Sequence, residues 1–458
     1  MKYMSLKEIA TACGGTYIGD SALFTKEVAG VAIDSRKIQS DYLFIPIKGA
    51  RVDGHSFISQ VMEQGALCTL SERELGDVSY PYILVDSCED AMKALAQHYR
   101  TSLGIKVIGI TGSVGKTSTK EMIASVLSQK FNVLKTEGNF NNEIGLPLTI
   151  FNIRDEHEIA ILEMGISDFG EMHRLAKMAR PDIFVMTNIG LCHLENLKDR
   201  DGILKAKSEI FDFIEEDAFI VLNGDDDKLH SIEEKNGIKP FFFGLSNDFD
   251  AYATDIIPRS LQGISCTMHL GEEQIPVLIP IPGQHMVYNA LAGALIGKKL
   301  GLSATDIKAG VEALVPVTGR NNLIATDSFV IIDDCYNANP VSTCASIDVL
   351  STATTRKVAI LGDMFELGEN EKDLHASVGS HASEKGIDVL IAIGELSKHT
   401  AHAASLNNDH IKVYHFDTKE SFIATSDSIL QKDDTILVKA SHGMEFPEIV
   451  NHLKAKGE

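Results

Sequence analysis

The amino-acid sequence predicts an α/β protein built from three domains. Its 458 residues are more than one hydrophobic core usually organises, which favours several domains. Two separate blocks of the chain alternate strand-like and helix-like segments, a pattern typical of parallel sheets with helices on both faces. A shorter first block mixes short helices and strands. We therefore expect a smaller N-terminal α/β domain over residues 1–104, a central parallel-sheet domain over 105–315 and a C-terminal Rossmann-like domain over 316–458.

The N-terminal block contains three recognisable elements. Residues Ser5–Cys13 have the pattern of a capped helix, which Gly14 stops. Residues Tyr42–Ile47 favour a strand, and residues Cys88–Arg100 have the apolar spacing of an amphipathic helix. These segments predict a mixed α/β fold for the first domain.

The central block starts a regular alternation of strands and helices. Buried strands are expected at Lys106–Ile110, Ile159–Leu162, Ile183–Met186 and Phe219–Leu222. Helices are expected at Lys116–Lys130, at His285–Leu300, and at Ala304–Leu314 after a Ser303 cap. Between Phe241 and Ile281 the pattern indicates short antiparallel strands, and Pro316 to Arg320 is typical of a linker.

The C-terminal block repeats the alternation. Strands are expected at Val330–Asp333, Lys357–Leu361, Val389–Ile393 and Thr435–Lys439. Helices are expected at Val341–Ser351, at Lys372–Lys385 and at the end of the chain. Such a block predicts a second doubly wound α/β domain.

The composition argues against several classes of function. With 42 basic and 64 acidic side chains the formal net charge is −22, unlike a protein that binds nucleic acid by releasing counterions. No run approaches the roughly twenty apolar residues of a membrane span, so we expect no stable membrane insertion. The seven cysteines are scattered without a CxxC pair, which argues against disulfides and a zinc site. Because the N-terminus also lacks a signal-peptide core, we expect a reduced, cytoplasmic protein.

The sharpest local signal is GITGSVGKT, from Gly109 to Thr117, between a predicted strand and a predicted helix. Glycines there let backbone N–H groups approach phosphate oxygens. Lys116 would reach the β- and γ-phosphates, and the Thr117 hydroxyl would hold Mg²⁺. The strict pattern GxxxxGK[ST] fails at Ile110. The context still favours a P-loop-type central sheet over a Gly-rich turn with a chance GKT.

Three further residues carry weaker signals on their own. Glu163 ends an apolar strand, where a carboxylate suits a Mg²⁺ ligand, although many strands end in an acidic residue. His193 follows another strand, and a lone histidine is more often a surface or satisfied core residue than a ligand. Lys207 lies on a predicted helix with Lys205, and its chemistry alone favours a solvated helix face.

Polar clusters near predicted element ends are the remaining candidates. Asn139, Asn141 and Asn142 are typical of a loop and helix cap, or of amides that bind phosphate or sugar. The segment DDCYNANP, which starts at Asp333, ends a strand and opens a helix, so it is either a cap or a ligand-binding edge. Asn289 lies in a helix of small apolar residues and is either solvent-facing or functional.

Taken together and in this order, the motifs resemble the Mur ligase family of peptidoglycan biosynthesis over nearly the whole chain. They are DSR at 34–36, DGHSF at 53–57, TGSVGKT at 111–117, GNFNNEIGLPLT at 138–149, EMG at 163–165, NIGLCHLE, KAKSEIF, NGDD, GQHMVYNALA, VTGR, DDCYNANP and LGDM. Two positions depart from the family. Tyr288 stands where the family often has His, and His442 stands where related enzymes often have Arg.

The resemblance implies roles for individual residues. It places ATP against Gly112, Ser113, Val114, Gly115, Lys116, Thr117, Ser118, Asn289, Arg320, Asp334 and Asn337. It implies metal binding by Thr117, Glu163, His193 and a carbamylated Lys207, and a catalytic role for Lys116, His193 and Lys207. It places Ser35 and Arg36 near the uridine diphosphate end of the substrate, and Asn141 and Asn142 between the sugar and the phosphates.

The resemblance also implies a reaction. GNFNNEIGLP, DDCYNANP and KASHGM are most similar to members that join D-alanyl-D-alanine to UDP-N-acetylmuramoyl-tripeptide through an acyl phosphate, using ATP and Mg²⁺. The DNPR segment of a member that reads diaminopimelate is absent from this sequence. The family resemblance favours a monomer. A ligase for a single amino acid or a folate tail, a P-loop switch protein and a non-catalytic nucleotide-binding scaffold are the alternatives. The motifs that precede the phosphate loop argue against a switch protein.

Overall fold

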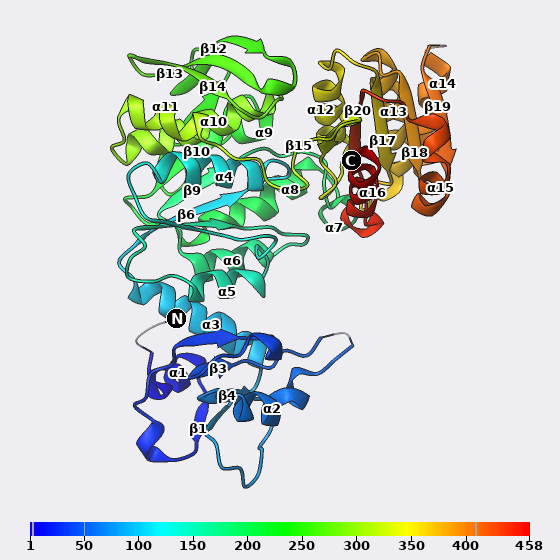
Figure 1. Cartoon of the computed structure of the whole chain (residues 1–458). Helices are drawn as coiled ribbons and strands as arrows, with labels where there is room; N and C mark the ends of the chain where they lie inside the picture. The colour runs from blue at the N-terminus through cyan, green and yellow to red at the C-terminus, as the bar shows by residue number, and fades with distance from the viewer. Residues whose placement is uncertain (2–3, 50, 408–409) are drawn as a thin grey trace.

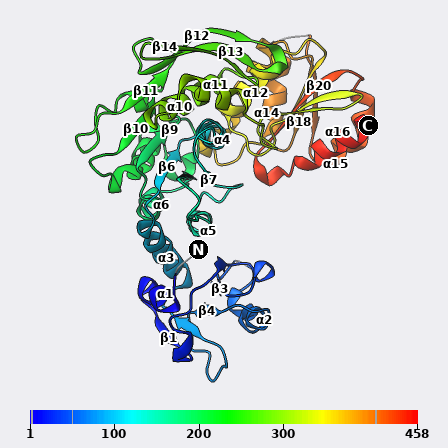
Figure 2. The same cartoon turned by 60° about the vertical axis from the view of Figure 1, so that its left-hand side comes forward.

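The computed structural model describes residues 1, 4–49, 51–407 and 410–458. The chain forms three sheets with helices, in sequence order (Figure 1). The central sheet lies between the other two along the chain, and the C-terminal sheet lies at its side in both views (Figures 1 and 2). None of the described helices has both the length and the apolarity that crossing a bilayer requires. The predicted α/β class with three sheet-containing units is confirmed.

The N-terminal sheet has five short strands in the order β1-β5-β4-β3-β2. The strands are β1 Thr16–Ile18, β2 Gly30–Ala32, β3 Tyr42–Phe44, β4 Cys68–Ser71 and β5 Tyr82–Leu84, and the helices are α1 Leu6–Cys13, α2 Ile58–Glu63 and α3 Cys88–Ser102. Ser5 and Glu8 form a capping box at the start of α1, as the sequence predicts for its cap. The strand expected to reach Ile47 ends at Phe44, because Pro46 has no N–H to donate to a neighbouring strand.

The central sheet has nine strands in the order β14-β13-β12-β11-β10-β9-β6-β8-β7. The strands are β6 Lys106–Thr111, β7 Val133–Lys135, β8 Ile159–Glu163, β9 Ile183–Met186, β10 Phe219–Asn223, β11 Phe241–Gly244, β12 Ala251–Pro258, β13 Ile264–Leu270 and β14 Glu273–Ile279. Neighbours from β7 to β12 are parallel, whereas β12–β13 and β13–β14 are antiparallel. The antiparallel prediction is therefore wrong for β11, because a crossover through α9 Asp227–His230 precedes it.

Helices cover both faces of the central sheet. On one face lie α4 Lys116–Leu127, α10 His285–Lys299 and α11 Ala304–Glu312; on the other lie α5 Gly145–Phe151, α6 Glu171–Ala179, α7 Leu194–Leu197 and α8 Arg200–Ser208. Alternation along β6 serves both cores, since Val107 packs with the α6 side and Ile108 with the α4 side. Helix α3 packs against α5 and α6, so the N-terminal unit shares a core with the central one (Figure 2).

The C-terminal sheet has six strands in the order β15-β16-β20-β17-β18-β19. The strands are β15 Asn322–Ala325, β16 Phe329–Asp333, β17 Lys357–Gly362, β18 Val389–Ile393, β19 Lys412–Phe416 and β20 Asp434–Lys439, and the helices are α12 Pro340–Ser351, α13 Glu371–Glu384, α14 Ser397–Asn407, α15 Lys419–Ile429 and α16 Pro447–Gly457. All neighbours are parallel except β15 and β16. Strands β15 and β19 lack a clear sequence signal because they are part-exposed edges.

Candidate active site

The phosphate loop connects β6 to α4 and depends on two glycines. Gly112 has φ 150°, and a Cβ added there would lie 1.9 Å from Thr187 Oγ1. Gly115 has φ 82° and precedes α4 as its N-cap. Residues that carry a side chain rarely adopt these backbone conformations, so both positions favour glycine. The resulting loop places backbone N–H groups at the N-terminus of a helix of twelve residues, which attracts anions.

The loop after β9 holds the phosphate loop in place. The Asn188 side chain makes two hydrogen bonds with Val114, accepting from its N–H and donating to its carbonyl, each at 2.9 Å. Thr187 Oγ1 donates to the same carbonyl at 2.6 Å, and Ser113 Oγ donates to Gly190 O at 3.0 Å. Side chains that fix a loop in this way preorganise it for a ligand. Asn188 opens the NIGLCHLE motif but is not among the predicted site residues.

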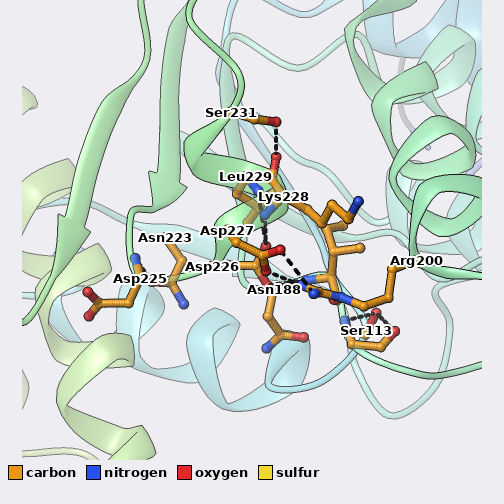
Figure 3. A network of polar contacts seen from close by, with 12 residues as sticks. Ser113, Asn188, Arg200, Asn223, Asp225, Asp226, Asp227, Lys228, Leu229 and Ser231 are labelled. Carbon is orange, nitrogen blue, oxygen red and sulfur yellow. Dashed lines mark hydrogen bonds and ion pairs between the residues drawn. The ribbon is translucent and has the colours of Figure 1, made fainter.

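The NGDD segment, residues 223–226, makes hydrogen bonds to the backbone around the loop after β9 (Figure 3). Asp226 Oδ2 accepts a hydrogen bond from Ile189 N at 2.8 Å, while Arg200 Nε donates to Ile189 O at 2.7 Å. The Arg200 guanidinium also pairs with the Asp227 carboxylate. Asn223 Nδ2 donates to Thr187 O at 3.0 Å. The motif therefore acts through the backbone that positions the phosphate loop.

A cavity of about 540 Å³ opens over the phosphate loop, between the central and C-terminal units. Its walls follow the carboxyl ends of β6, β8 and β9 on one side and of β16 and β20 on the other, where ligands bind in parallel sheets. The predicted site residues that line it are Ser113, Val114, Gly115, Lys116, Thr117, Ser118, Asn141, Asn142, Glu163, His193, Asn289, Arg320, Asp334 and Asn337. Gly112, Lys207, Ser35 and Arg36 are not among its lining residues.

Glu163 ends β8 and is only 1% exposed. Its Oε1 accepts a hydrogen bond from Asn141 Nδ2 at 2.9 Å, which joins two of the predicted residues. Its Oε2 has no hydrogen-bond partner among the described residues. A buried carboxylate oxygen without a donor is costly unless a cation compensates it. Lys120 Nζ lies 3.8 Å from this oxygen, beyond hydrogen-bond distance. The arrangement therefore leaves Oε2 able to ligate a divalent cation, and Thr117 lines the same cavity.

His193 caps α7 with φ 51°, and its Nδ1 lies 2.6 Å from Glu366 Oε2 of the C-terminal unit. Burial lowers the pKa of His193, as do the ammonium groups of Lys207 and Lys116, whereas Glu366 raises it. Lys116 Nζ donates to Gly112 O at 2.8 Å. His193 is therefore a contact point between the two units beside the phosphate loop.

Lys207 and Lys205 have opposite environments on α8. Lys207 is 1% exposed, and burial together with the Lys116 ammonium lowers its pKa to about 7. Lys205 is exposed, with Nζ 5.7 Å from the centre of the Phe169 ring. The solvated-face interpretation is therefore wrong for Lys207 and correct for Lys205. Burial explains the difference, because Lys207 lies on the face of α8 that carries Ile203 and Ala206 into the core.

The C-terminal unit contributes charged and aromatic groups to the cavity. Arg320 Nη2 donates to Thr117 Oγ1 at 3.2 Å, and its guanidinium lies 4.0 Å from the centre of the Tyr336 ring. Asp334 Oδ2 pairs with Lys439 Nζ at 2.6 Å, and Lys439 also donates to Asn337 O at 3.0 Å. Sequence reasoning missed Lys439 and Tyr336. Two features of the sequence could have identified them. Lys439 ends a predicted strand, and Tyr336 lies within DDCYNANP.

Asn289 is buried at 6% exposure, which decides against a solvent-facing position. Its Oδ1 accepts a hydrogen bond from Thr119 Oγ1 at 2.9 Å, so it ties α10 to α4. Its neighbour Tyr288 also lines the cavity, and burial and the Asp225 carboxylate raise the pKa of Tyr288. The departure from the family pattern at Tyr288 is therefore at the cavity wall.

Ser35 and Arg36 lie in a short 3₁₀ turn of the N-terminal unit. The Arg36 guanidinium forms a bidentate pair with the Asp34 carboxylate, at 2.9 and 2.8 Å, and its side chain is 86% exposed. A substrate bound to both these residues and the cavity would have to be long. Nothing in the cavity's geometry assigns a role to either residue.

Comparison with known proteins gives the family. Three family models match the chain: Mur ligase family, catalytic domain at residues 27–100; Mur ligase middle domain at 110–297; and Mur ligase, glutamate ligase domain at 319–442. The UDP-N-acetylmuramoyl-tripeptide–D-alanyl-D-alanine ligase of Bacillus subtilis (strain 168) is 38% identical over 454 residues, which cover 98% of each protein. The chain belongs to the Mur ligase family.

Solved Mur ligase structures have the same fold. MurF from Acinetobacter baumannii matches with a TM-score of 0.90 at 30% identity, over 99% of both chains. The MurF ligase of Thermotoga maritima, in complex with ADP, matches with a TM-score of 0.82 at 28% identity, over 93% of this chain and 97% of that one. No cluster of three or more His, Cys, Asp or Glu side chains able to hold a metal occurs among the residues described for this Mur ligase. A Mg²⁺ ion held partly by phosphates needs only one or two carboxylates.

Proposed function

We propose that this Mur ligase joins D-alanyl-D-alanine to UDP-N-acetylmuramoyl-tripeptide, with ATP, in cytoplasmic peptidoglycan precursor synthesis. The observation that carries the proposal is the full-length similarity to the Bacillus subtilis ligase of that name. The ADP complex of the Thermotoga maritima relative and the phosphate loop over a cavity of about 540 Å³ support ATP as the nucleotide. The enzyme would act as a monomer in the cytoplasm.

The reaction must activate a carboxylate, because oxide is too poor a leaving group for an amine to displace at neutral pH. The terminal carboxylate of the tripeptide attacks the γ-phosphorus of ATP, and the bond to the ADP oxygen breaks. The products are an acyl phosphate and ADP. The amine of D-alanyl-D-alanine then attacks the acyl carbon, the bond to phosphate breaks, and the nitrogen loses a proton. Each step brings negative groups together, so the protein must supply positive charge.

The nucleotide residues other than Gly112 line the cavity. We assign the phosphates to the backbone from Gly112 to Ser118 and to the Lys116 ammonium, and the rest of the nucleotide to Asn289, Arg320, Asp334 and Asn337. Thr117 and Glu163 would hold Mg²⁺, which would neutralise phosphate charge when bound. The catalytic role of Lys116 would be to stabilise charge on the transferred phosphoryl group. Two units that meet over the cavity would also keep water from the acyl phosphate.

His193 and Lys207 are assigned to a second metal. A free ammonium at Lys207 would repel a cation, whereas a carbamate would offer two oxygens to it. A carbamate forms from the neutral amine and CO₂. The buried position of Lys207, and a pKa of about 7 set mainly by that burial, favour the neutral amine. Lys207 is not in the cavity wall, but it is close enough to Lys116, which lines the cavity, for the Lys116 ammonium to lower its pKa.

The substrate residues span two units. Asn141 and Asn142 would lie between the sugar and the phosphates of the substrate, and both line the cavity. Ser35 and Arg36 would contact its uridine diphosphate end from the N-terminal unit. Under this proposal the domain boundaries are 1–104, 105–315 and 316–458, each containing one of the three sheets.

The test is phosphate release from ATP in the presence of each acceptor and amine, alone and in pairs. We expect release only with UDP-N-acetylmuramoyl-tripeptide and D-alanyl-D-alanine together. A higher rate with lysine or diaminopimelate and the shorter dipeptide substrate would reassign the enzyme within the family. Release with a folate substrate and glutamate would identify a folate-tail ligase. Nucleotide hydrolysis without any acceptor would favour a switch protein.

A further inference from the structure

Helix α4 carries a second lysine, Lys120, that the proposed reaction does not use. It lies one turn after Lys116 and is 1% exposed, among the largest fully buried side chains of the described residues. A buried ammonium is costly unless anions and hydrogen-bond acceptors compensate it. Its surroundings therefore indicate what it is for.

The Lys120 ammonium lies between two strand ends and two carboxylates. Its Nζ donates to Thr136 O at 2.5 Å, and it lies 3.3 Å from Glu121 Oε1 and 3.8 Å from Glu163 Oε2. Thr136 Oγ1 in turn accepts the backbone N–H of Glu163 at 3.0 Å. Lys120 thus contacts Glu163 through its charge and through the residue that holds the Glu163 backbone.

The remaining contacts leave Glu163 as the carboxylate that Lys120 compensates. Glu121 also pairs with the Lys135 ammonium, so its charge is shared between two cations. The other oxygen of Glu163 accepts from Asn141, and Oε2 has no hydrogen-bond donor among the described residues. Among the described residues, Lys120 is the cation that forms an ion pair with Oε2, while the Lys116 ammonium also interacts electrostatically with Glu163. Asn141 and Lys120 therefore contact the two different oxygens of the same carboxylate.

We propose that Lys120 is a positioning residue that orients the Glu163 carboxylate for the divalent cation of the phosphate site. The inference rests on the proposed function, since it concerns the metal assigned to Thr117 and Glu163. Groups that hold a metal ligand from behind commonly change metal affinity about ten- to hundredfold when they are removed. Loss of a positive charge alone would have the opposite sign, because it would make the site more attractive to Mg²⁺.

The experiment measures ADP binding by calorimetry as a function of Mg²⁺ concentration, with no acceptor or amine present. Lys120→Gln keeps a donor for Thr136 O but removes the charge, and we expect it to raise the Mg²⁺ concentration for half-maximal ADP binding about tenfold. Lys120→Arg keeps the charge and should stay within about threefold of the parent protein, since the metal ligand keeps a cationic neighbour. Lys135→Met is the matched control. It removes the other cation that pairs with Glu121, without touching Glu163.

Each outcome decides the inference. An unchanged Mg²⁺ requirement in Lys120→Gln, with a lowered thermal unfolding midpoint, would mean that Lys120 only stabilises the fold. A lowered requirement would mean that it acts only as a repelling charge. Either result overturns the positioning role. An equal increase in Lys120→Arg or in Lys135→Met would also overturn it. Failure of the proposed function is distinguishable, because phosphate release with each acceptor and amine tests the ligase reaction separately, and ADP binding by the parent protein without regard to Mg²⁺ would refute the metal assignment itself.

Discussion

Arg320 Nη2 and Thr117 Oγ1 lie 3.2 Å apart and join the linker to the phosphate loop. The same guanidinium lies against the Tyr336 ring, 4.0 Å from its centre, so two groups fix its plane. Gly319 precedes Arg320 with φ 74° and donates its N–H to Asp333 Oδ2 at 2.9 Å. The linker is therefore attached to the C-terminal sheet by its backbone and to the central unit by its side chain.

Replacing Arg320 by alanine should weaken ADP binding. The guanidinium lies at the phosphate site, and a hydrogen bond to a charged group contributes about 1.5–3 kcal/mol, so we expect a loss of about tenfold or more in affinity. Calorimetric titration with ADP and Mg²⁺ measures it. Arg320→Lys should recover only part of the affinity, because an ammonium lacks the planar fork that stacks on Tyr336. Full affinity in Arg320→Ala would remove Arg320 from the nucleotide site.

Nucleotide and substrate should bring the central and C-terminal units closer together. Arg320 and the His193–Glu366 contact lie where the two units meet, and ligands bound between units favour closed arrangements. We expect the radius of gyration from solution scattering to fall when an ATP analogue and the tripeptide substrate are added. An unchanged or larger radius of gyration in the parent protein would contradict closure around this linker.

Gly112→Ala should impair the protein more than Gly115→Ala. A Cβ at 112 would meet Thr187 Oγ1 at 1.9 Å, whereas at 115 the nearest atom is Asn289 Oδ1 at 3.9 Å. Both changes strain a positive φ, but only the first displaces the loop after β9 as well, with a cost of about 1–3 kcal/mol. Urea unfolding and ADP titration measure the two effects. Adding Thr187→Ala should recover part of the stability of Gly112→Ala, and equal behaviour of the two glycine variants would contradict the steric explanation.

Local motifs predict the phosphate loop well because its chemistry is local. Gly112, Gly115, Lys116 and Thr117 lie within six consecutive residues, so spacing alone places them together. The carboxyl edge of a parallel sheet similarly predicts that Glu163 and Asp334 face a ligand site, and both line the cavity. Apolar runs likewise identify β6, β8, β9 and β10 of the central sheet, because buried strands of a parallel sheet are continuous apolar runs.

The rest of the site depends on tertiary contacts that no local pattern encodes. Lys207 and Lys205 are equivalent in the sequence, and only packing of α8 makes one buried and the other exposed. Lys439 pairs with Asp334 because β20 lies beside β16, although about a hundred residues separate them along the chain. A lysine in a helix normally keeps its ammonium in water, so the sequence alone would place Lys120 on a solvated face. Charged residues buried by distant elements are therefore where the sequence is least informative.

Lys116→Ala should abolish ligation while leaving the fold intact. The ammonium would stabilise charge on the transferred phosphoryl group, and loss of one such group costs about 10²–10³-fold in rate. Its contacts in the structure are to carbonyls of its own loop, so the core is not disturbed. Phosphate release and circular dichroism measure the two properties. Lys106→Ala, an exposed lysine at the start of β6, is the control and should keep the parent rate.

Lys207→Ala should be nearly inactive, whereas Lys205→Ala should behave like the parent protein. The two residues differ by about 200° around the helix, and the structure places Lys207 in the core and Lys205 in solvent. If Lys207 carries a carbamate, Lys207→Ala removes both the side chain and its negative charge. The variant then has an empty space and lacks one anion near the second metal. A short carboxylic acid such as formate or acetate should then restore part of the activity of Lys207→Ala.

The rescue separates a carbamate from a structural lysine. A buried lysine that only packs would leave a cavity, and the lost activity would follow stability and would not respond to carboxylates. A carbamate also requires CO₂, so the parent protein prepared without bicarbonate should regain activity when bicarbonate is added, and Lys207→Ala should not. Mass spectrometry of the native protein should show an added mass that acid removes. Full activity in Lys207→Ala contradicts the assignment outright, and inactivity of Lys205→Ala alone would move the metal-binding role two residues along α8.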